Sequence, residues 1–159
     1  MKIVIVSDTH GSRKNIEKIC ESNPDTDMLI HLGDVEGDED YIEAIFDCPA
    51  HIVAGNNDFF SRLPREEEFE LEGHHIFISH GHAYYVSMGE MHLKEEARRR
   101  GADIVMYGHT HRPFLDVEND LVTLNPGSVS FPRQQGRKAT YMVMKLEKNT
   151  RPEVELKYV

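Results

Sequence analysis

The segment KIVIVSDTH, residues 2–10, decides the fold. Its first five residues are dominated by β-branched side chains, and this pattern predicts a strand buried on both faces, as in a parallel sheet. Ser7 and Asp8 end the apolar run so early that we expect neither a signal peptide nor a membrane span here. Asp8 and His10 then place a carboxylate and an imidazole directly after the strand. The rest of the chain repeats this arrangement of a buried strand followed by polar side chains.

The first third of the chain alternates between strand-like and helix-like segments. Apolar runs at 28–32 and 50–54 predict two further buried strands. Segments at about 13–22 and 38–46 have the spacing of amphipathic helices. The resulting β-α-β-α-β order is typical of a parallel α/β sheet.

The middle and the end of the chain predict a different arrangement. Residues 68–79 have the pattern of a hairpin, and Ser87 to Glu90 match a capping box that opens a helix ending near Arg100. A buried strand at 103–107 follows. We expect the last strands to be mostly antiparallel and to fold back as a second sheet. These strands are predicted at 114–117, 121–125, 139–146 and 153–159.

Composition limits the class of protein. The 159 residues are enough for one domain, which we place at residues 1–159. Cys20 and Cys48 lack the spacing of metal or redox sites, so we expect reduced core residues of a cytoplasmic protein. The formal net charge is −10, and without a basic stripe or an aromatic platform it disfavours long nucleic acids. A small phosphate substrate stays compatible, because bound cations can reverse the local field.

Five polar clusters each follow a predicted strand. In open α/β sheets, ligands bind beyond the carboxyl ends of the strands, so we expect these clusters to converge. Their imidazoles, carboxylates and amides suit divalent metals, and no thiolate is among them. The clusters are Asp8-Thr9-His10, Gly33-Asp34, Gly55-Asn56-Asn57-Asp58, His80-Gly81-His82 and Gly108-His109-Thr110-His111.

As an ordered set, these motifs resemble those of the calcineurin-like metallophosphoesterase superfamily. The chain length and the later Asn125-Pro126-Gly127-Ser128 are similar to those of its compact bacterial and archaeal phosphodiesterase branch. The resemblance covers about residues 3–130. It implies a four-layer α/β/β/α sandwich of two mixed sheets flanked by helices, with a dinuclear metal site at the sheet edges. It also implies a metal-dependent phosphoric ester hydrolase.

The resemblance assigns seven metal ligands. Family members use manganese, iron, zinc, nickel or magnesium, and a set rich in histidine favours Mn²⁺ or another transition metal over Mg²⁺. We therefore expect two divalent cations, with Mn²⁺ first and Ni²⁺, Zn²⁺, Fe²⁺ or Mg²⁺ as alternatives. The ligands would be Asp8, His10 and His111 for the first metal, Asn56, His80 and His109 for the second, and Asp34 as a bridge.

The same resemblance suggests a mechanism and its weak point. Two metals can bridge one water, lower its pKa toward about 7 and direct the hydroxide at phosphorus. In the family, the acid at the position of Asp58 orients a histidine. Many members also carry a histidine general acid where this chain has Asn57, which cannot donate a titrating proton. We therefore expect a preference for good leaving groups, or proton donation by another residue such as His82.

Several assignments stay open at the level of sequence. Asn125 and Ser128 could contact the substrate phosphate or simply form a turn, and Arg133 could hold a phosphate or be a solvated charge. A phosphodiesterase is favoured over a phosphomonoesterase or protein phosphatase because of Asn57 and because little chain is left for a specificity cap. A non-catalytic scaffold of the same fold is the other alternative, disfavoured because all seven presumed ligands are present. Exposed sheet edges and family habit suggest a homodimer.

Overall fold

The computed structural model describes residues 1–159 and contains ten strands and three α-helices. The strands are β1 (Lys2–Val6), β2 (Met28–His31), β3 (Ala50–Ile52), β4 (Glu66–Leu71), β5 (His74–Ser79), β6 (Ile104–Met106), β7 (Pro113–Val117), β8 (Val122–Pro126), β9 (Thr140–Lys145) and β10 (Glu153–Tyr158). The helices are α1 (Arg13–Ser22), α2 (Glu39–Phe46) and α3 (Met91–Arg100), with two short 3₁₀ helices, η1 (His82–Tyr84) and η2 (Val86–Met88). None of the helices is both long and apolar enough to cross a membrane.

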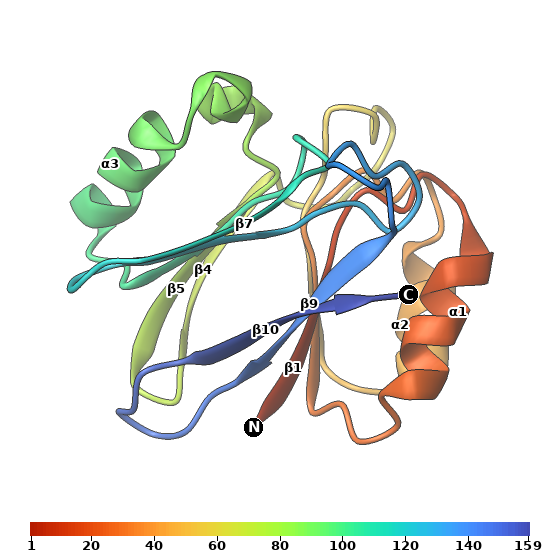
Figure 1. Ribbon diagram of the computed structural model, residues 1–159, viewed down its shortest axis with the longest axis horizontal. Helices are drawn as coiled ribbons and strands as arrows, with labels where there is room; N and C mark the ends of the chain where they lie inside the picture. Colours follow the sequence, from red (N-terminus) through yellow and green to blue (C-terminus); the bar gives the residue numbers. More distant parts are fainter.

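Two five-stranded mixed sheets pack face to face, and helices cover both outer faces (Figure 1). The first sheet has the strand order β10-β9-β1-β2-β3, and the second has the order β4-β5-β6-β8-β7. α1 and α2 lie on the outside of the first sheet, and α3 lies on the outside of the second. The predicted four-layer α/β/β/α sandwich is confirmed.

β1 is buried on both faces because apolar layers lie on either side of it. Ile3 and Ile5 point into the core between the two sheets, and Val4 and Val6 point into the core beneath α1 and α2. All four side chains are 0% exposed. Since full burial of such a side chain is worth about 1.5–3 kcal/mol, this central strand anchors the fold.

Parallel pairing aligns the strand ends that the motifs follow. β1, β2 and β3 run parallel to one another in the first sheet, as do β5, β6 and β8 in the second. The loops that leave their carboxyl ends gather at one edge of the sandwich, at the top of Figure 1. This edge carries the motif residues.

The expected fold-back of the last strands is only partly right. β7 and β8 complete the second sheet, but β8 pairs with β6 in parallel. β9 and β10 return to the first sheet, where β9 lies antiparallel to β1 and brings Val143 opposite Val4. Like β1, β9 has apolar side chains on both faces, and the position beside β1 buries all of its residues except Lys145.

The predicted capping box at Ser87 is wrong. Ser87 lies in η2, and α3 begins only at Met91, with Glu90 at its N-cap and no capping bond from a side chain. Gly89 between them has φ +118°, which interrupts the helix. The carboxylate of Glu90 instead accepts a hydrogen bond of 2.7 Å from the Tyr107 hydroxyl.

Candidate metal centre

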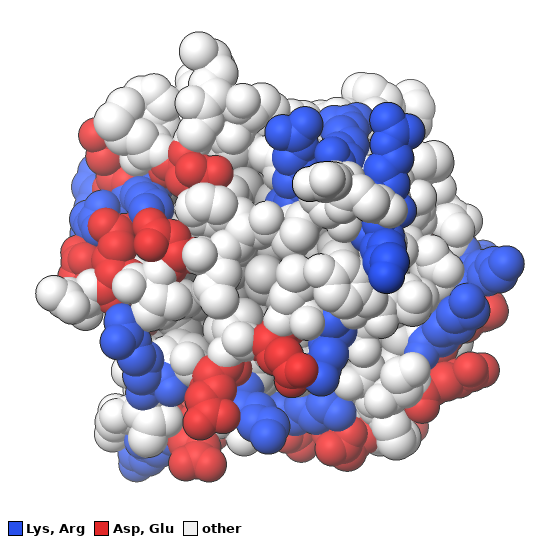
Figure 2. Space-filling view, viewed as in Figure 1, with Lys and Arg blue, Asp and Glu red and all other residues white.

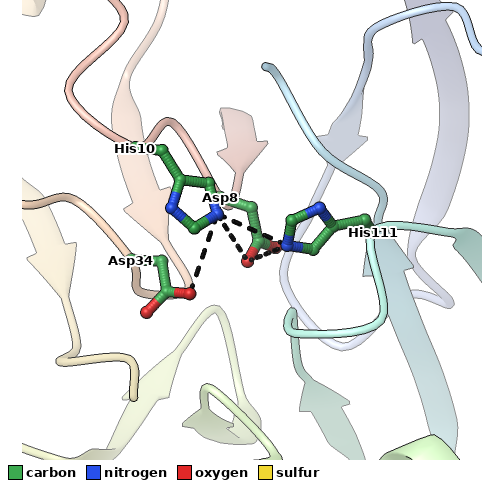
Figure 3. A group of neighbouring side chains, drawn as sticks. All are labelled: Asp8, His10, Asp34 and His111. Atoms are coloured by element: carbon green, nitrogen blue, oxygen red, sulfur yellow. Dashed lines mark hydrogen bonds and ion pairs between the residues drawn. The ribbon is translucent and has the colours of Figure 1, made fainter. Parts of the chain in front are cut away.

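Asp8, His10 and His111, which we call the first donor group, lie in a compact cluster with Asp34 (Figure 3). One potential ligand atom of each residue lies within 4.8 Å of those of the others. His111 Nε2 is 3.2 Å from Asp8 Oδ1 and 3.4 Å from His10 Nε2. Asp8 Oδ1 is buried and has no hydrogen-bond partner. A buried carboxylate oxygen that faces imidazole nitrogens without hydrogen bonding is well suited to a divalent cation, so these residues fit a metal site.

Asn56, His80 and His109, which we call the second donor group, meet at the amide oxygen of Asn56. Asn56 Oδ1 accepts hydrogen bonds from His80 Nε2 at 3.1 Å and from His109 Nδ1 at 2.8 Å. Burial alone would lower the pKa of His80, but its contacts with the carboxylates of Asp34 and Asp8 outweigh burial and raise it. The three atoms that could bind a metal therefore already lie close together, because both ring nitrogens are hydrogen-bonded to the amide oxygen.

Asp34 lies between the two donor groups. Its Oδ2 is 3.8 Å from His10 Nε2 and 3.5 Å from His80 Nε2. Asn57 holds this carboxylate from the other side, since its backbone N–H and its side-chain amide each donate a hydrogen bond of 2.8 Å. Burial alone would raise the pKa of Asp34, but the contacts with His80 and Asn57 lower it below its usual range. The carboxylate is thus ionised and placed to serve both groups.

The opposite nitrogens of three donor rings are fixed by hydrogen bonds. His80 Nδ1 donates to the carbonyl of Leu32 at 2.6 Å, and His111 Nδ1 donates to the carbonyl of Phe131 at 2.8 Å. His10 Nδ1 donates to Glu36 at 2.7 Å. Such partners set the ring orientation and direct Nε2 toward the site, which is how histidines are held in metal sites. In His10 and His111 this nitrogen is left for a metal, whereas in His80 it is hydrogen-bonded to Asn56 Oδ1.

The backbone is unusual at five of the donor residues. Their φ angles fall in the left-handed region, which residues other than glycine and asparagine rarely adopt. The values are +55° for Asp8, +46° for His10, +55° for Asp34, +67° for His109 and +56° for His111. Backbone strain of this kind gathers at functional sites, where the surrounding structure holds it in place.

Two glycines make the close approach of the loops possible. A Cβ atom on Gly55 would lie 2.1 Å from Asp34 Oδ1, and one on Gly108 would lie 2.0 Å from Ser7 Oγ. A side chain at position 55 would also meet the backbone N of Asp34 at 2.4 Å and would shift the donor loop, whereas one at position 108 would displace the hydroxyl of Ser7.

Asp58 does not orient a histidine, in contrast to the expectation from the family. Its carboxylate accepts hydrogen bonds from the backbone N–H groups of Gly55, Val35 and Glu36, at 2.7, 3.3 and 2.7 Å. It therefore ties the loop after β2 to the loop after β3. The position of Asp34 depends on this connection.

His82 lies beside the second donor group. Its ring centre is 5.5 Å from that of His80 and 6.0 Å from that of His109. Its Nδ1 is buried and has no hydrogen-bond partner. Burial and the neighbouring His80 lower the pKa of His82.

Asn125 and Ser128 are fully buried, which argues against the expected contact with substrate. The amide of Asn125 donates to the carbonyl of Gly108 at 2.8 Å and to Thr110 Oγ1 at 3.0 Å. Ser128 Oγ donates to the carbonyl of Asp8 at 2.9 Å. Both side chains are 0% exposed and hold the loops that carry the first donor group.

Sequence reasoning did not single out Glu36 or His31 as parts of the site. His31 is 0% exposed and shares a hydrogen bond of 3.0 Å between Nε2 and Thr9 Oγ1, in the middle of the Asp8–His10 loop. Burial is the main reason that its pKa falls from 6.5 to about 4. The one sequence signal for Glu36 is its position as an acidic residue two places after Asp34. Nothing in the strand pattern distinguishes His31 from other buried residues.

Comparison with known proteins places this geometry in a family. The model of the calcineurin-like phosphoesterase superfamily domain matches residues 1–149. A probable metallophosphoesterase of Methanocaldococcus jannaschii, MJ0623, is 35% identical over 84% of this chain and 70% of its own length. The phosphodiesterase MJ0936 of the same organism is 32% identical over 80% of this chain and 83% of its own.

Solved structures share the fold. A predicted phosphoesterase from Streptococcus pneumoniae superposes with a TM-score of 0.83 at 29% identity, over 98% of this chain and 87% of that one. Vps29 from Entamoeba histolytica, solved with Zn²⁺, has a TM-score of 0.80 over 99% of each chain, but at 17% identity it shows the fold alone. The chain belongs to the calcineurin-like phosphoesterase superfamily, alongside metallophosphoesterases and phosphodiesterases of bacteria and archaea.

Proposed function

We propose that this protein is a phosphodiesterase that uses two divalent metal ions to hydrolyse small phosphodiesters. The observation that carries the proposal is the position of Asp34 Oδ2, 3.8 Å from His10 Nε2 in the first donor group and 3.5 Å from His80 Nε2 in the second. One carboxylate between two sets of nitrogen and oxygen donors is the arrangement of a site for two cations. The relatives named phosphodiesterases support the substrate class.

In this proposal the first metal takes Asp8, His10 and His111, the second takes Asn56, His80 and His109, and Asp34 bridges the two. Four imidazoles with two carboxylates and one amide oxygen favour Mn²⁺ or another transition metal over Mg²⁺. Metal ions held here would bind the non-bridging oxygens of the phosphate and lower the pKa of a water molecule that attacks phosphorus.

The residues of the chain supply position and charge. Asn57 holds Asp34 through two hydrogen bonds. The carbonyls of Leu32 and Phe131 and the carboxylate of Glu36 fix three of the rings. Because the pKa values of Asp8 and Asp34 are both lowered, the site stays anionic at neutral pH and needs no proton release from these groups to accept a cation.

Protonation of the leaving group is the step for which the chain is least equipped. Asn57 has no titrating proton, and its side-chain amide is already bonded to Asp34. We infer that the rate depends steeply on the pKa of the leaving group, because general acid catalysis is typically worth about 10²–10⁴-fold. A series of aryl phosphodiesters tests this, and a flat dependence in the wild type that becomes steep in His82→Gln would instead identify His82 as the proton donor.

The decisive experiment starts from metal-stripped protein refilled with Mn²⁺, Ni²⁺, Zn²⁺ or Mg²⁺. We expect two bound equivalents of Mn²⁺ and hydrolysis of bis(p-nitrophenyl) phosphate faster than of p-nitrophenyl phosphate. Faster cleavage of the monoester would favour a phosphomonoesterase or protein phosphatase. Metal binding without hydrolysis of either ester would favour the non-catalytic scaffold and overturn the proposal.

Two further parts of the proposal concern the setting of the enzyme. Cys20 and Cys48 are both free, as suits a reducing cytoplasm. The edge strands are β10 and β3 in the first sheet and β4 and β7 in the second. A homodimer through such an edge stays a prediction, which analytical ultracentrifugation tests.

A further inference from the structure

Three arginines stand beside the first donor group without any acidic partner. Arg112, Arg133 and Arg137 line a cavity of about 790 Å³ whose wall also includes His10 and His111. All three residues are exposed, and none of their guanidinium groups makes an ion pair or a side-chain hydrogen bond. The cavity therefore joins the metal centre to a region of uncompensated positive charge.

This arrangement contrasts with the arginines of α3. Arg98, Arg99 and Arg100 of α3 are all paired with carboxylates, at 2.8, 2.6 and 2.6 Å. Arg62 and Arg65 likewise make no ion pair, but they line neither this cavity nor the one beside it. Figure 2 shows one group of basic side chains without acidic neighbours, over the loops at the upper right that also lie above the sheets in Figure 1. The three cavity arginines are distinguished because their unpaired guanidinium groups share one cavity with the first donor group, which suits that cavity to an anionic ligand.

The backbone fixes these arginines relative to the metal centre. Arg112 directly follows His111, and the backbone N–H of Arg133 donates to the carbonyl of His111 at 2.9 Å. The carbonyl of Phe131 in turn accepts the hydrogen bond from His111 Nδ1. The backbone segments that carry Arg112 and Arg133 are thus connected to the ring of His111, so these two side chains start close to the first donor group.

We propose that Arg112, Arg133 and Arg137 form a subsite for a second phosphate group of the substrate. The proposal rests on the proposed phosphodiesterase function and deepens it by naming the substrate class, a small phosphodiester that carries another phosphate. Guanidinium groups present paired N–H donors that match phosphate oxygens. A simple diester has one negative charge, and the metal centre already balances it. The three arginine side chains are therefore matched only by additional negative charge on the substrate.

The cavities leave room for the rest of such a substrate. Arg112 and Arg133 also line a neighbouring cavity of about 500 Å³ that includes Thr110 and Phe114. Both volumes are within the usual range for small-molecule sites. The exposed ring of Phe131 forms an apolar wall next to His10, with their ring centres 5.2 Å apart. A nucleotide-like substrate with two phosphates fits this combination, whereas the net charge of −10 opposes a long polyanion.

The test compares two substrates that differ by one phosphate. The p-nitrophenyl ester of thymidine 5′-phosphate is assayed with and without a 3′-phosphate, using protein loaded with Mn²⁺. We expect the 3′-phosphate to lower KM about tenfold at similar kcat, because charge-assisted hydrogen bonds are among the stronger polar interactions. Arg112→Gln combined with Arg133→Gln should abolish this difference, and Arg137→Gln should reduce it. Arg99→Gln, the same charge change on α3, should leave it intact.

A second readout separates this proposal from the proposed function. Calorimetry compares the binding of thymidine 3′,5′-bisphosphate and thymidine 5′-monophosphate to the Mn²⁺-loaded protein. Tighter binding of the bisphosphate by about tenfold, lost in the double variant but kept in Arg99→Gln, supports the subsite even if neither ester is hydrolysed. Hydrolysis of both esters with equal KM, together with equal binding of the two nucleotides, would overturn the subsite and leave the phosphodiesterase proposal standing.

Discussion

The two donor groups share one carboxylate but differ in how their own atoms are satisfied. The first donor group has a buried oxygen without a partner on Asp8, and all three of its residues have left-handed backbone. In the second donor group, Asn56 Oδ1 already accepts hydrogen bonds from both rings, and only His109 has left-handed backbone. A cation at the first group would bind a carboxylate oxygen that has no hydrogen-bond partner. A cation at the second group must instead replace existing hydrogen bonds. We therefore expect the first group to bind its metal more tightly.

Asp8→Asn should produce the largest effect, because it removes the charge that the first metal neutralises. We expect kcat/KM for bis(p-nitrophenyl) phosphate to fall by about 10³-fold or more, since a catalytic metal contributes several kcal/mol. Elemental analysis should show loss of the tightly bound metal. Asp40→Asn, the same change at an exposed position on α2, serves as the control. Retention of two tightly bound metals in Asp8→Asn would remove the basis of the comparison.

Asn56→Ala should have a smaller effect that is confined to the second donor group. We expect one equivalent of Mn²⁺ to stay tightly bound and kcat to fall by about 10²–10³-fold, the usual effect of losing one electrostatic contact with the transition state. Titration of the stripped variant with Mn²⁺, followed by calorimetry, measures the remaining equivalent. If the tight site is the one that disappears, the order of affinities is the reverse of the order proposed here.

His31 contacts the loop of the first donor group through Thr9 and the backbone N–H of Gly33 beside Asp34, and its burial predicts a dependence of stability on pH. Its pKa is 6.5 in the unfolded chain and about 4 in the folded protein, so the unfolded chain binds the proton more readily. The stabilisation is therefore complete above pH 6.5 and is lost as the pH falls through this window toward 4. The loss is about 3 kcal/mol in the free energy of unfolding.

Urea unfolding of metal-free protein at pH 7, 5 and 4 measures this effect. His31→Asn should be less stable than the wild type at pH 7 but should lose less stability between pH 7 and 4. His92→Asn, at an exposed histidine on α3, should follow the wild-type curve. Parallel curves for the wild type and His31→Asn would show that His31 is not held neutral.

Asn57→Ala tests whether both groups depend on Asp34, and its effect should be the smallest. It removes one of the two hydrogen bonds that hold the Asp34 carboxylate. We expect both metal affinities to weaken by similar factors of about 10–100, as is typical when a partner of a metal ligand is lost. Asn119→Ala, at an exposed position, is the matched control. Weakening of one metal only would mean that Asp34 is a ligand of that metal and not a bridge.

The fold and the gathering of the clusters could be predicted because both follow from local pattern. Each buried run ends in a polar cluster, and parallel pairing then brings those ends to one edge. The return of β9 to β1 could not be predicted, because it pairs residues such as Ile5 and Met142 that are distant in sequence. The same holds for contacts such as Thr9 with His31 and Asn125 with Gly108, which depend on how the loops cross after folding.

The place of β1 in its sheet has a consequence for how the protein is made. β1 leaves the ribosome well before β9, yet the two strands are neighbours in the sheet. Until β9 has been synthesised, the β1 edge that β9 will cover therefore has unpaired backbone groups, and such edges are prone to aggregation in nascent chains. The loop from Asp8 to His10 is anchored at the end of this strand, so it gains its final support only after β9 has been synthesised. A chaperone that binds early chains of this protein would be expected to protect that edge.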